Sequence, residues 1–209
     1  SGTESRGQIT GGAVIIDGTA YPVSKSYFNT LTLTNVKVPV KAKGVMVSGT
    51  VKSYNPGNAT TIQLMQGGKE IYSTNIDAAT DSGQVTQEFT FNVVAPGTYD
   101  LVVTKAAHLT YTIKNVEVGD TPLDLTGNSN AAISTMTLLA GDVNGDGLID
   151  VGDLSIVWNT ANYNKTISAA DNKATDLNGD NLVDVGDLNI VWKAANYNKK
   201  ADTHCVVSY

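Results

Sequence analysis

Two stretches of twelve residues carry the oxygen-bearing side chains best suited to binding a metal ion. Each places aspartate or asparagine at its first, third, fifth, ninth and twelfth positions. The stretches run from Asp142 to Asp153 and from Asp176 to Asp187, and together they hold eight of the twenty acidic residues. Ca²⁺ takes about six to eight oxygen ligands, and alternate side chains of a tightly wound loop converge on one centre. The spacing therefore predicts two Ca²⁺ sites.

The expected ligands form two matching sets. The seventh position contributes its backbone carbonyl, so its own side chain is free to be apolar. The twelfth position opens a helix, where a carboxylate also complements the positive end of the helix dipole. The first set is Asp142, Asn144, Asp146, Leu148, Asp150 and Asp153, and the second is Asp176, Asn178, Asp180, Leu182, Asp184 and Asp187.

Both stretches depart from the standard EF-hand loop, which has glutamate at position 12 and glycine at position 6. Position 12 is aspartate in each, and position 6 is Gly147 in the first loop but Asn181 in the second. Asparagine is the best non-glycine occupant of left-handed backbone space, so the turn survives with some strain. We therefore expect the second loop to be the weaker site.

A duplication supports calcium binding over the alternative that these are ordinary solvated turns. The segment from Asp142 to Lys165 matches the segment from Asp176 to Lys199 at 18 of 24 positions. Each copy is a polar loop followed by an apolar stretch with helical periodicity. The expected inward stripe is Ile149, Leu154 and Val157 in the first copy and Val183, Leu188 and Val191 in the second, with Ile156 and Ile190 off it.

The chain ahead of the loops reads as β-structure. Between residues 44 and 139, apolar residues alternate in short runs such as Phe89, Phe91 and Val93, and turn residues separate the runs. Strands spaced about 8–12 residues apart predict a sandwich. The run from Ala95 to Leu101 resembles a strand of transthyretin-like modules. Residues 1–43 read as extended segments, at 13–16 and 30–40, and belong either to an upstream domain or to an extra hairpin.

Composition excludes several classes of function. The net charge of −6 argues against nucleic acid and anionic membranes as partners, and no apolar run has the length of a membrane span. We expect His108 to be exposed or at a strand edge, and His204 and Cys205 to lie in a disordered tail over 201–209. No nucleophile–base set or zinc-ligand cluster stands out. The chain is therefore predicted not to be an enzyme.

The run Gly-Asp-Val-Asn-Gly-Asp-Gly-Leu-Ile-Asp from Gly141, with its second copy, resembles the dockerin family. The resemblance covers residues 141–200, and the order of sandwich then dockerin resembles X-module–dockerin pairs. It implies a mixed fold, with an all-β Ig-like or transthyretin-like sandwich at 44–139 and a small all-α dockerin at 140–200. It also implies a cohesin domain of a scaffoldin as partner. The setting would be secreted and extracellular, in a cellulosome or on the cell surface of an anaerobic bacterium.

The dockerin pattern also implies which residues contact the partner. These are Val151, Gly152, Trp158, Asn159 and Tyr163 in the first copy and Val185, Gly186, Trp192, Lys193 and Tyr197 in the second. The set is apolar and aromatic, which favours an interface anchored by Trp and Tyr. The alternative is that Trp158 and Trp192 pack the two copies together or against the sandwich.

Two further functions stay open at this point. The sandwich could bind carbohydrate through Tyr54, Tyr72 and Tyr111, with the dockerin as its anchor. Alternatively, because the chain begins at Ser1 without Met, it could be the terminal part of a secreted glycoside hydrolase. An upstream domain would then bring plant cell-wall polysaccharide as a second partner.

Overall fold

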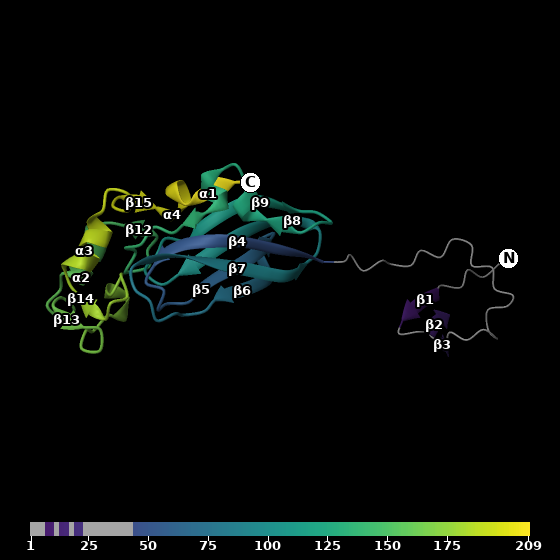
Figure 1. The fold of residues 1–209 in the computed structure, drawn as a ribbon, viewed down its shortest axis with the longest axis horizontal. Helices are drawn as coiled ribbons and strands as arrows, with labels where there is room; N and C mark the ends of the chain where they lie inside the picture. Colours follow the sequence, from purple (N-terminus) through teal and green to yellow (C-terminus); the bar gives the residue numbers. More distant parts are fainter. Residues whose placement is uncertain (1–6, 11–12, 17–18, 23–43) are drawn as a thin grey trace. The chain divides into compact units, whose positions relative to one another are not determined.

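The computed structural model describes residues 7–10, 13–16, 19–22 and 44–209 of a chain that divides into two compact units, Ser1–Ala42 and Lys43–Tyr209 (Figure 1). In the first unit, β1 (Gly7–Thr10), β2 (Ala13–Ile16) and β3 (Thr19–Pro22) form an antiparallel sheet in that order. The extended segment expected at 13–16 is therefore confirmed. The one expected at 30–40 lies outside the described residues.

Two sheets of the second unit face each other as the expected sandwich (Figure 1). In the first sheet, β4 pairs with β7 antiparallel and with two short strands in parallel. Its strands are β4 (Val45–Tyr54), β7 (Gln84–Val94), β10 (Leu123–Asp124) and β11 (Met136–Thr137). The second sheet has the order β16-β9-β8-β5-β6. Its strands are β5 (Thr60–Gln66), β6 (Lys69–Ile76), β8 (Gly97–Lys105), β9 (Tyr111–Val118) and β16 (Val206–Ser208).

Alternating apolar residues on the inner faces fill the space between the sheets. Val47, Leu64, Leu101 and Ile113 are fully buried, while their neighbours along each strand are more exposed. Successive residues of a β-strand point to opposite faces of the sheet, so this alternation of buried and exposed positions is expected. Tyr99 is also buried, and its hydroxyl donates a hydrogen bond to the carbonyl of Ala95.

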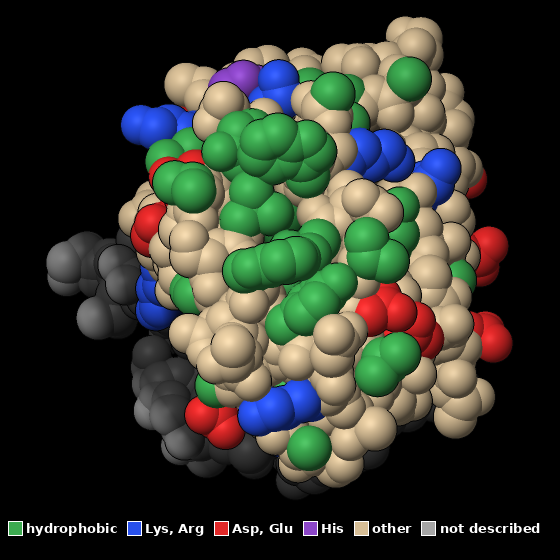
Figure 2. Space-filling view, turned by 90° about the vertical axis from the view of Figure 1, so that its left-hand side faces the viewer, with side chains coloured by type: hydrophobic (Ala, Val, Ile, Leu, Met, Phe, Trp, Pro, Cys, Tyr) green, Lys and Arg blue, Asp and Glu red, His purple; other side chains and the backbone are tan. Residues whose placement is uncertain are grey.

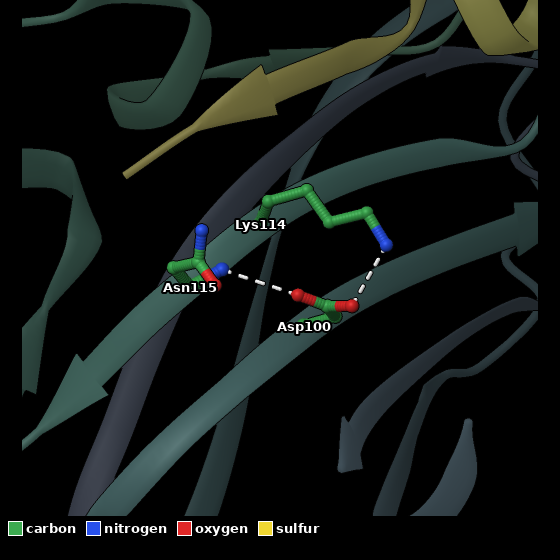
Figure 3. A network of polar contacts seen from close by, with 3 residues as sticks. All are labelled: Asp100, Lys114 and Asn115. Atoms are coloured by element: carbon green, nitrogen blue, oxygen red, sulfur yellow. Dashed lines mark hydrogen bonds and ion pairs between the residues drawn. The ribbon is translucent and has the colours of Figure 1, made fainter. Parts of the chain in front are cut away.

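A β-bulge interrupts the pairing of β8 with β9 on the outer face (Figure 3). Asn115 has a φ of 58°, and its N–H donates to Asp100 Oδ1 at 3.1 Å. Lys114 Nζ lies 2.7 Å from Asp100 Oδ2. Partial burial raises the pKa of Asp100, but the Lys114 ammonium and the Asn115 N–H outweigh it and leave that pKa below its ordinary value. Both side chains are partly exposed, so the ion pair fixes local geometry more than it stabilises the fold.

The rest of the second unit forms short helices and two-residue strands. They are η1 (Leu125–Gly127), α1 (Ala131–Ser134), β12 (Leu148–Ile149), α2 (Val151–Val157), β13 (Lys165–Thr166), η2 (Lys173–Thr175), β14 (Leu182–Val183), α3 (Val185–Trp192), β15 (Lys199–Lys200) and α4 (Ala201–His204). The segment directly ahead of the first loop is part helix and part strand, because Asn130 caps a single helical turn at Ala131–Ser134 and β11 follows it. Each expected loop is followed by a helix, as predicted. None of the helices described is long and apolar enough to cross a membrane.

Each loop–helix copy pairs a short strand of its loop with a short strand at the end of the other copy. β12, from the first loop, pairs with β15, which ends the second copy. β14, from the second loop, pairs with β13, which ends the first copy. The pairing continues beyond the strands, since Ala201 N–H donates to the carbonyl of Gly147 and Ile167 N–H to that of Asn181. Each loop is therefore held in shape by the opposite copy.

The expectation of a disordered tail at 201–209 is wrong. Residues Val206–Ser208 form β16, which pairs in parallel with β9, and Thr112 N–H donates to the carbonyl of Cys205 at 2.8 Å. Cys205 is fully buried, and burial raises the pKa of its thiol to about 11. Three residues are too few to show the alternation of a strand in the sequence. They are ordered by pairing with the edge of β9. The boundary between residues 139 and 140 stays a prediction, since both sides lie in one compact unit.

The expected exposure of His108 is also wrong. Its ring is buried at the end of the sandwich, where Nε2 accepts a hydrogen bond from Tyr54 N–H at 3.2 Å and Nδ1 donates to the carbonyl of Ala106 at 2.7 Å. Burial lowers the pKa of His108 to about 4, and the nearby Lys105 charge acts in the same direction. The imidazole is therefore a neutral link between β4 and the turn after β8.

This burial predicts a loss of stability in mild acid. A neutral buried histidine contributes stability above its unfolded pKa of about 6.5, and that contribution is lost as the pH falls towards 4. The stability lost follows from the lowered pKa of His108 and is about 3 kcal/mol. Urea unfolding of the wild type and of His108→Gln at pH 7 and pH 4.5 should show a shallower pH dependence in the variant. Parallel pH dependences would contradict a neutral, buried His108.

Candidate functional site

The carboxylate at position 12 ties each loop to the start of its helix. Asp153 is fully buried, and its Oδ1 accepts hydrogen bonds from the N–H groups of Val143 at 2.8 Å and Asn144 at 3.1 Å. Its Oδ2 accepts from Asp150 N–H at 2.9 Å, while the side chain of Asp150 caps α2. One carboxylate therefore spans the beginning of the loop, its ninth position and the first turn of the helix.

The second loop repeats this arrangement. Asp187 is fully buried and accepts hydrogen bonds from the N–H groups of Leu177 at 2.7 Å, Asn178 at 3.2 Å and Asp184 at 2.9 Å. Burial raises the pKa of Asp187 to about 6, against the lowering effect of these three donors. Burial raises the pKa of Asp153 as well. Both loops therefore hold a carboxylate that is costly to ionise without a nearby positive charge.

The first position of the first loop carries an oxygen with no partner. Asp142 is buried, and its Oδ2 accepts a hydrogen bond from Gly147 N–H at 3.1 Å. Its Oδ1 is buried and unbonded among the described residues. Burial raises the pKa of Asp142, and the charges of Asp153 and Asp146 add to this effect. A buried, unpaired carboxylate oxygen beside other carboxylates fits a cation.

The other loop side chains point at backbone groups. Asn144 Oδ1 accepts from Asp146 N–H, and Asp146 Oδ1 accepts from Leu148 N–H, both at 2.9 Å. The matching bonds in the second loop are also 2.9 Å long. Across the described residues, no three carboxylate, imidazole or thiol groups are already gathered as a metal centre. The structure thus gives the loop path and leaves the set of ligands as a prediction.

Position 6 has a left-handed backbone in both loops, as the sharp turn at this position requires. Gly147 has a φ of 82° and Asn181 a φ of 71°. Asn181 N–H donates to Asp176 Oδ2 at 3.0 Å, which reproduces the bond between Gly147 and Asp142. The turn is therefore kept in the second loop, where asparagine occupies a backbone region that glycine enters at lower cost.

The apolar stripe packs the two helices together. Ile149, Val157, Val183 and Val191 are fully buried, and Leu154 and Leu188 are half-buried. The expectation that Ile190 lies off the buried face is wrong. Ile190 is buried, and its carbonyl accepts a hydrogen bond from Asn196 Nδ2 at 2.8 Å. A helix of eight residues has a second face whose covering depends on segments distant in sequence, so its periodicity could not reveal this burial.

Both tryptophans are exposed on the outer face of the helices. Trp158 is 62% exposed and Trp192 is 61% exposed. Each lies against a tyrosine of its own copy, with ring centroids 4.6 Å apart for Trp158 and Tyr163 and 4.8 Å apart for Trp192 and Tyr197. The alternative that the tryptophans are core residues is therefore wrong for this structure.

A shallow groove of about 350 Å³ runs between the tryptophans. Figure 2 shows hydrophobic side chains gathered across this end of the molecule, with lysines at the margin. Val151 and Val185 are exposed as well, at 62% and 58%. The groove is lined by Leu154, Trp158, Val185, Leu188, Asn189 and Trp192.

The remaining predicted contact residues are less uniform. Asn159 and Lys193 are exposed, whereas Gly152, Gly186 and the two stacked tyrosines are half-buried. Sequence reasoning assigned Leu154 and Leu188 to the inner stripe only, yet both also line the groove. Their spacing of three and four residues from the contact positions could have shown this dual exposure.

The left-handed backbone at position 6 yields a matched pair of variants. Asn181→Gly should stabilise the protein by about 0.5 kcal/mol, since glycine enters this region at lower cost. Gly147→Asn should destabilise it by a similar amount. Thermal unfolding of both variants beside the wild type checks the two signs. If Asn181→Gly lowers the melting temperature, the asparagine side chain supports the turn and the strain argument is wrong.

Comparisons with known proteins agree with this geometry. Residues 140–196 match the family model of the dockerin type I domain. No curated protein matches the chain. A crystal structure of a type II cohesin–X–dockerin complex from Acetivibrio cellulolyticus, an N-terminal interface mutant, is similar at 27% identity and a TM-score of 0.56. A C-terminal interface mutant of that complex is similar at 25% identity and a TM-score of 0.57. Each match covers 76% of this chain and 99% of the other.

These matches span both parts of the second unit. Dockerin type I domains typically bind calcium, and in this chain buried aspartates lie in both loops. The sandwich followed by the two loop–helix copies has the fold of the matched X–dockerin structures. Residues 140–196 of this chain therefore match the dockerin type I family, and the sandwich ahead of them is similar in fold and position to the X-module of the matched complexes.

Proposed function

We propose that this chain is a calcium-dependent docking module whose dockerin binds a cohesin domain. The observation that carries the proposal is the exposure of Trp158 and Trp192 on one apolar face whose helices begin at buried loop carboxylates. Exposed aromatic residues around an apolar groove are typical of the energetic centres of protein interfaces. The matched solved structures are complexes of a dockerin with a cohesin, which supports the same kind of partner here.

The proposal includes two Ca²⁺ ions, one in each loop. The side chains at positions 1, 3, 5, 9 and 12 and the carbonyl at position 7 would supply the oxygen ligands. The unpaired Oδ1 of Asp142 supports a cation in the first loop, and the full burial of the Asp187 carboxylate at the equivalent of Asp153 supports one in the second. The proposed ligands are Asp142, Asn144, Asp146, Leu148, Asp150, Asp153, Asp176, Asn178, Asp180, Leu182, Asp184 and Asp187.

The proposed partner is the cohesin of a scaffoldin outside the cell. Attachment to a cellulosome or to the cell surface would follow from that partner, and any polysaccharide would be bound by another domain. In the proposed contact surface both helices contribute equivalent residues. These are Val151, Gly152, Trp158, Asn159, Tyr163, Val185, Gly186, Trp192, Lys193 and Tyr197.

Carbohydrate binding by the sandwich has less support. Of the three tyrosines that could form a platform, Tyr111 is buried and its hydroxyl donates to the carbonyl of Ala132 at 2.7 Å. Tyr72 is half-buried, packs edge-on against Tyr99 and accepts a hydrogen bond from Ala95 N–H. Two of the three rings are therefore committed to internal contacts, and we keep docking as the single proposed function.

The direct test is calorimetric titration of the chain with type I and type II cohesins. Both types belong in the panel because the family model is type I, whereas the matched complexes are type II. We expect saturable one-to-one binding to at least one cohesin in millimolar calcium, and loss of that binding in excess EDTA. Equal affinity in calcium and in EDTA would contradict a calcium-dependent surface.

The near identity of the two copies predicts binding in two orientations related by about 180°. Trp158→Ala and Trp192→Ala should then each weaken binding partially and equally, while the double variant should lose about 100-fold or more in affinity. A single variant with wild-type affinity would reject two equivalent orientations. Ser155 versus Asn189 and Asn159 versus Lys193 are exposed differences between the copies that would favour one orientation.

A further inference from the structure

The sandwich bonds directly to ligand positions of the second calcium loop. Beside the first loop its bond is to Gly141, one residue before position 1, whose N–H donates to the carbonyl of Ala107 at 2.8 Å. Asn55 Nδ2 donates a buried hydrogen bond to the carbonyl of Asp176 at 2.7 Å. Gly83 N–H donates to the carbonyl of Asn178 at 2.6 Å. Asp176 and Asn178 are positions 1 and 3 of the loop, so two turns of the X-module fix the backbone of two proposed ligands.

The two turns are tied to each other before they reach the loop. Asn55 follows β4, has a φ of 52° and donates its N–H to the carbonyl of Gly83 at 3.0 Å. Ala79 N–H donates to the carbonyl of Pro56 at 2.8 Å, which joins the same two turns at a second place. Asn55 is only 7% exposed. The donor side chain is therefore preorganised by the sandwich.

The close approach depends on a glycine in the second loop. A Cβ added at Gly179 would lie 2.6 Å from Asn55 Oδ1 and 2.9 Å from its Cγ. The equivalent residue of the first loop, Gly145, has nothing within 4 Å of such a Cβ. The two glycines share almost the same backbone, with φ values of 76° and 75°. They differ in their surroundings, because only the second loop contacts the sandwich at this position.

From these contacts we propose that Asn55 is a positioning residue for the second calcium site, through which the X-module raises the calcium affinity of that loop alone. Fixing the carbonyls of Asp176 and Asn178 before the ion arrives removes part of the ordering cost of binding. The support acts on the loop that carries asparagine at position 6, where the backbone is less favourable. This inference rests on the proposed calcium binding and adds a dependence of one site on the neighbouring module.

The first experiment compares calcium titrations of the wild type and Asn55→Gly. Glycine keeps the positive φ at this position while removing the amide donor, so the turn is retained. In the full chain, the amide resonances of Leu148 and Leu182 report the first and second loops separately. Loss of a buried hydrogen bond to a loop should weaken calcium binding to the second loop by about tenfold. The first loop should change by less than about twofold on the same scale.

The matched glycines isolate the contact itself. Gly179→Ala and Gly145→Ala place the same side chain in the same strained backbone, so their shared strain cancels in the comparison. Only Gly179→Ala meets Asn55, and it should weaken the second loop more than Gly145→Ala weakens the first. Asn55→Gly removes the obstructing side chain, so it should restore part of the affinity lost in Gly179→Ala.

The outcomes separate the inference from the proposed function. If the wild type binds calcium in neither loop, the proposed function fails. If both loops bind but Asn55→Gly weakens both equally or neither, the sandwich does not position the second site, and calcium-dependent docking still stands. Should Asn55→Gly fail to fold, equal effects of Gly179→Ala and Gly145→Ala on their own loops would overturn the inference.

Discussion

The dockerin depends on one buried carboxylate in each loop. Asp153 and Asp187 accept three backbone hydrogen bonds apiece, from the start of the loop and from the residue that caps the helix. A helix of seven or eight residues has little stability of its own, so its position has to come from tertiary contacts. Burying an ionised carboxylate is costly unless positive charge compensates it. The proposed calcium ions would supply that charge, which couples ion binding to the placement of both tryptophans.

The two copies are similar in sequence but differ in their surroundings. Strand pairing is equivalent in the two copies, with β12 bonded to β15 and β14 bonded to β13. The sandwich contacts the two copies differently, since Asn55 and Gly83 bond to the second loop and not to the first. The chain then returns to the sandwich, where β16 covers the edge of β9. The apparently symmetric outer face of the helices therefore rests on asymmetric contacts. The sandwich bonds to the carbonyls of positions 1 and 3 of the second loop, whereas beside the first loop it bonds only to Gly141, one residue before position 1.

The sequence was informative where a short repeating pattern sets the structure. The spacing of aspartates located both loops, and alternation of apolar residues located the sandwich strands such as β7 and β8. Contacts between distant segments were not predictable in this way. Several features depend on which segments meet after folding. These are the burial of His108 and Ile190, the ordering of Cys205 and the hydrogen bond from Asn55 to Asp176. Each involves one or a few residues, which is too short a stretch to carry a period.

Hydrogen exchange of the helix amides with and without calcium tests the central coupling most directly. In millimolar calcium, the amides of Leu154 and Leu188, whose carbonyl partners are Asp150 and Asp184, should be strongly protected. In excess EDTA their protection should fall by about 100-fold or more, because the buried carboxylates lose their compensating charge. Protection that is unchanged by chelation would show that the helices are placed without the ions, and would contradict the coupling of calcium to docking.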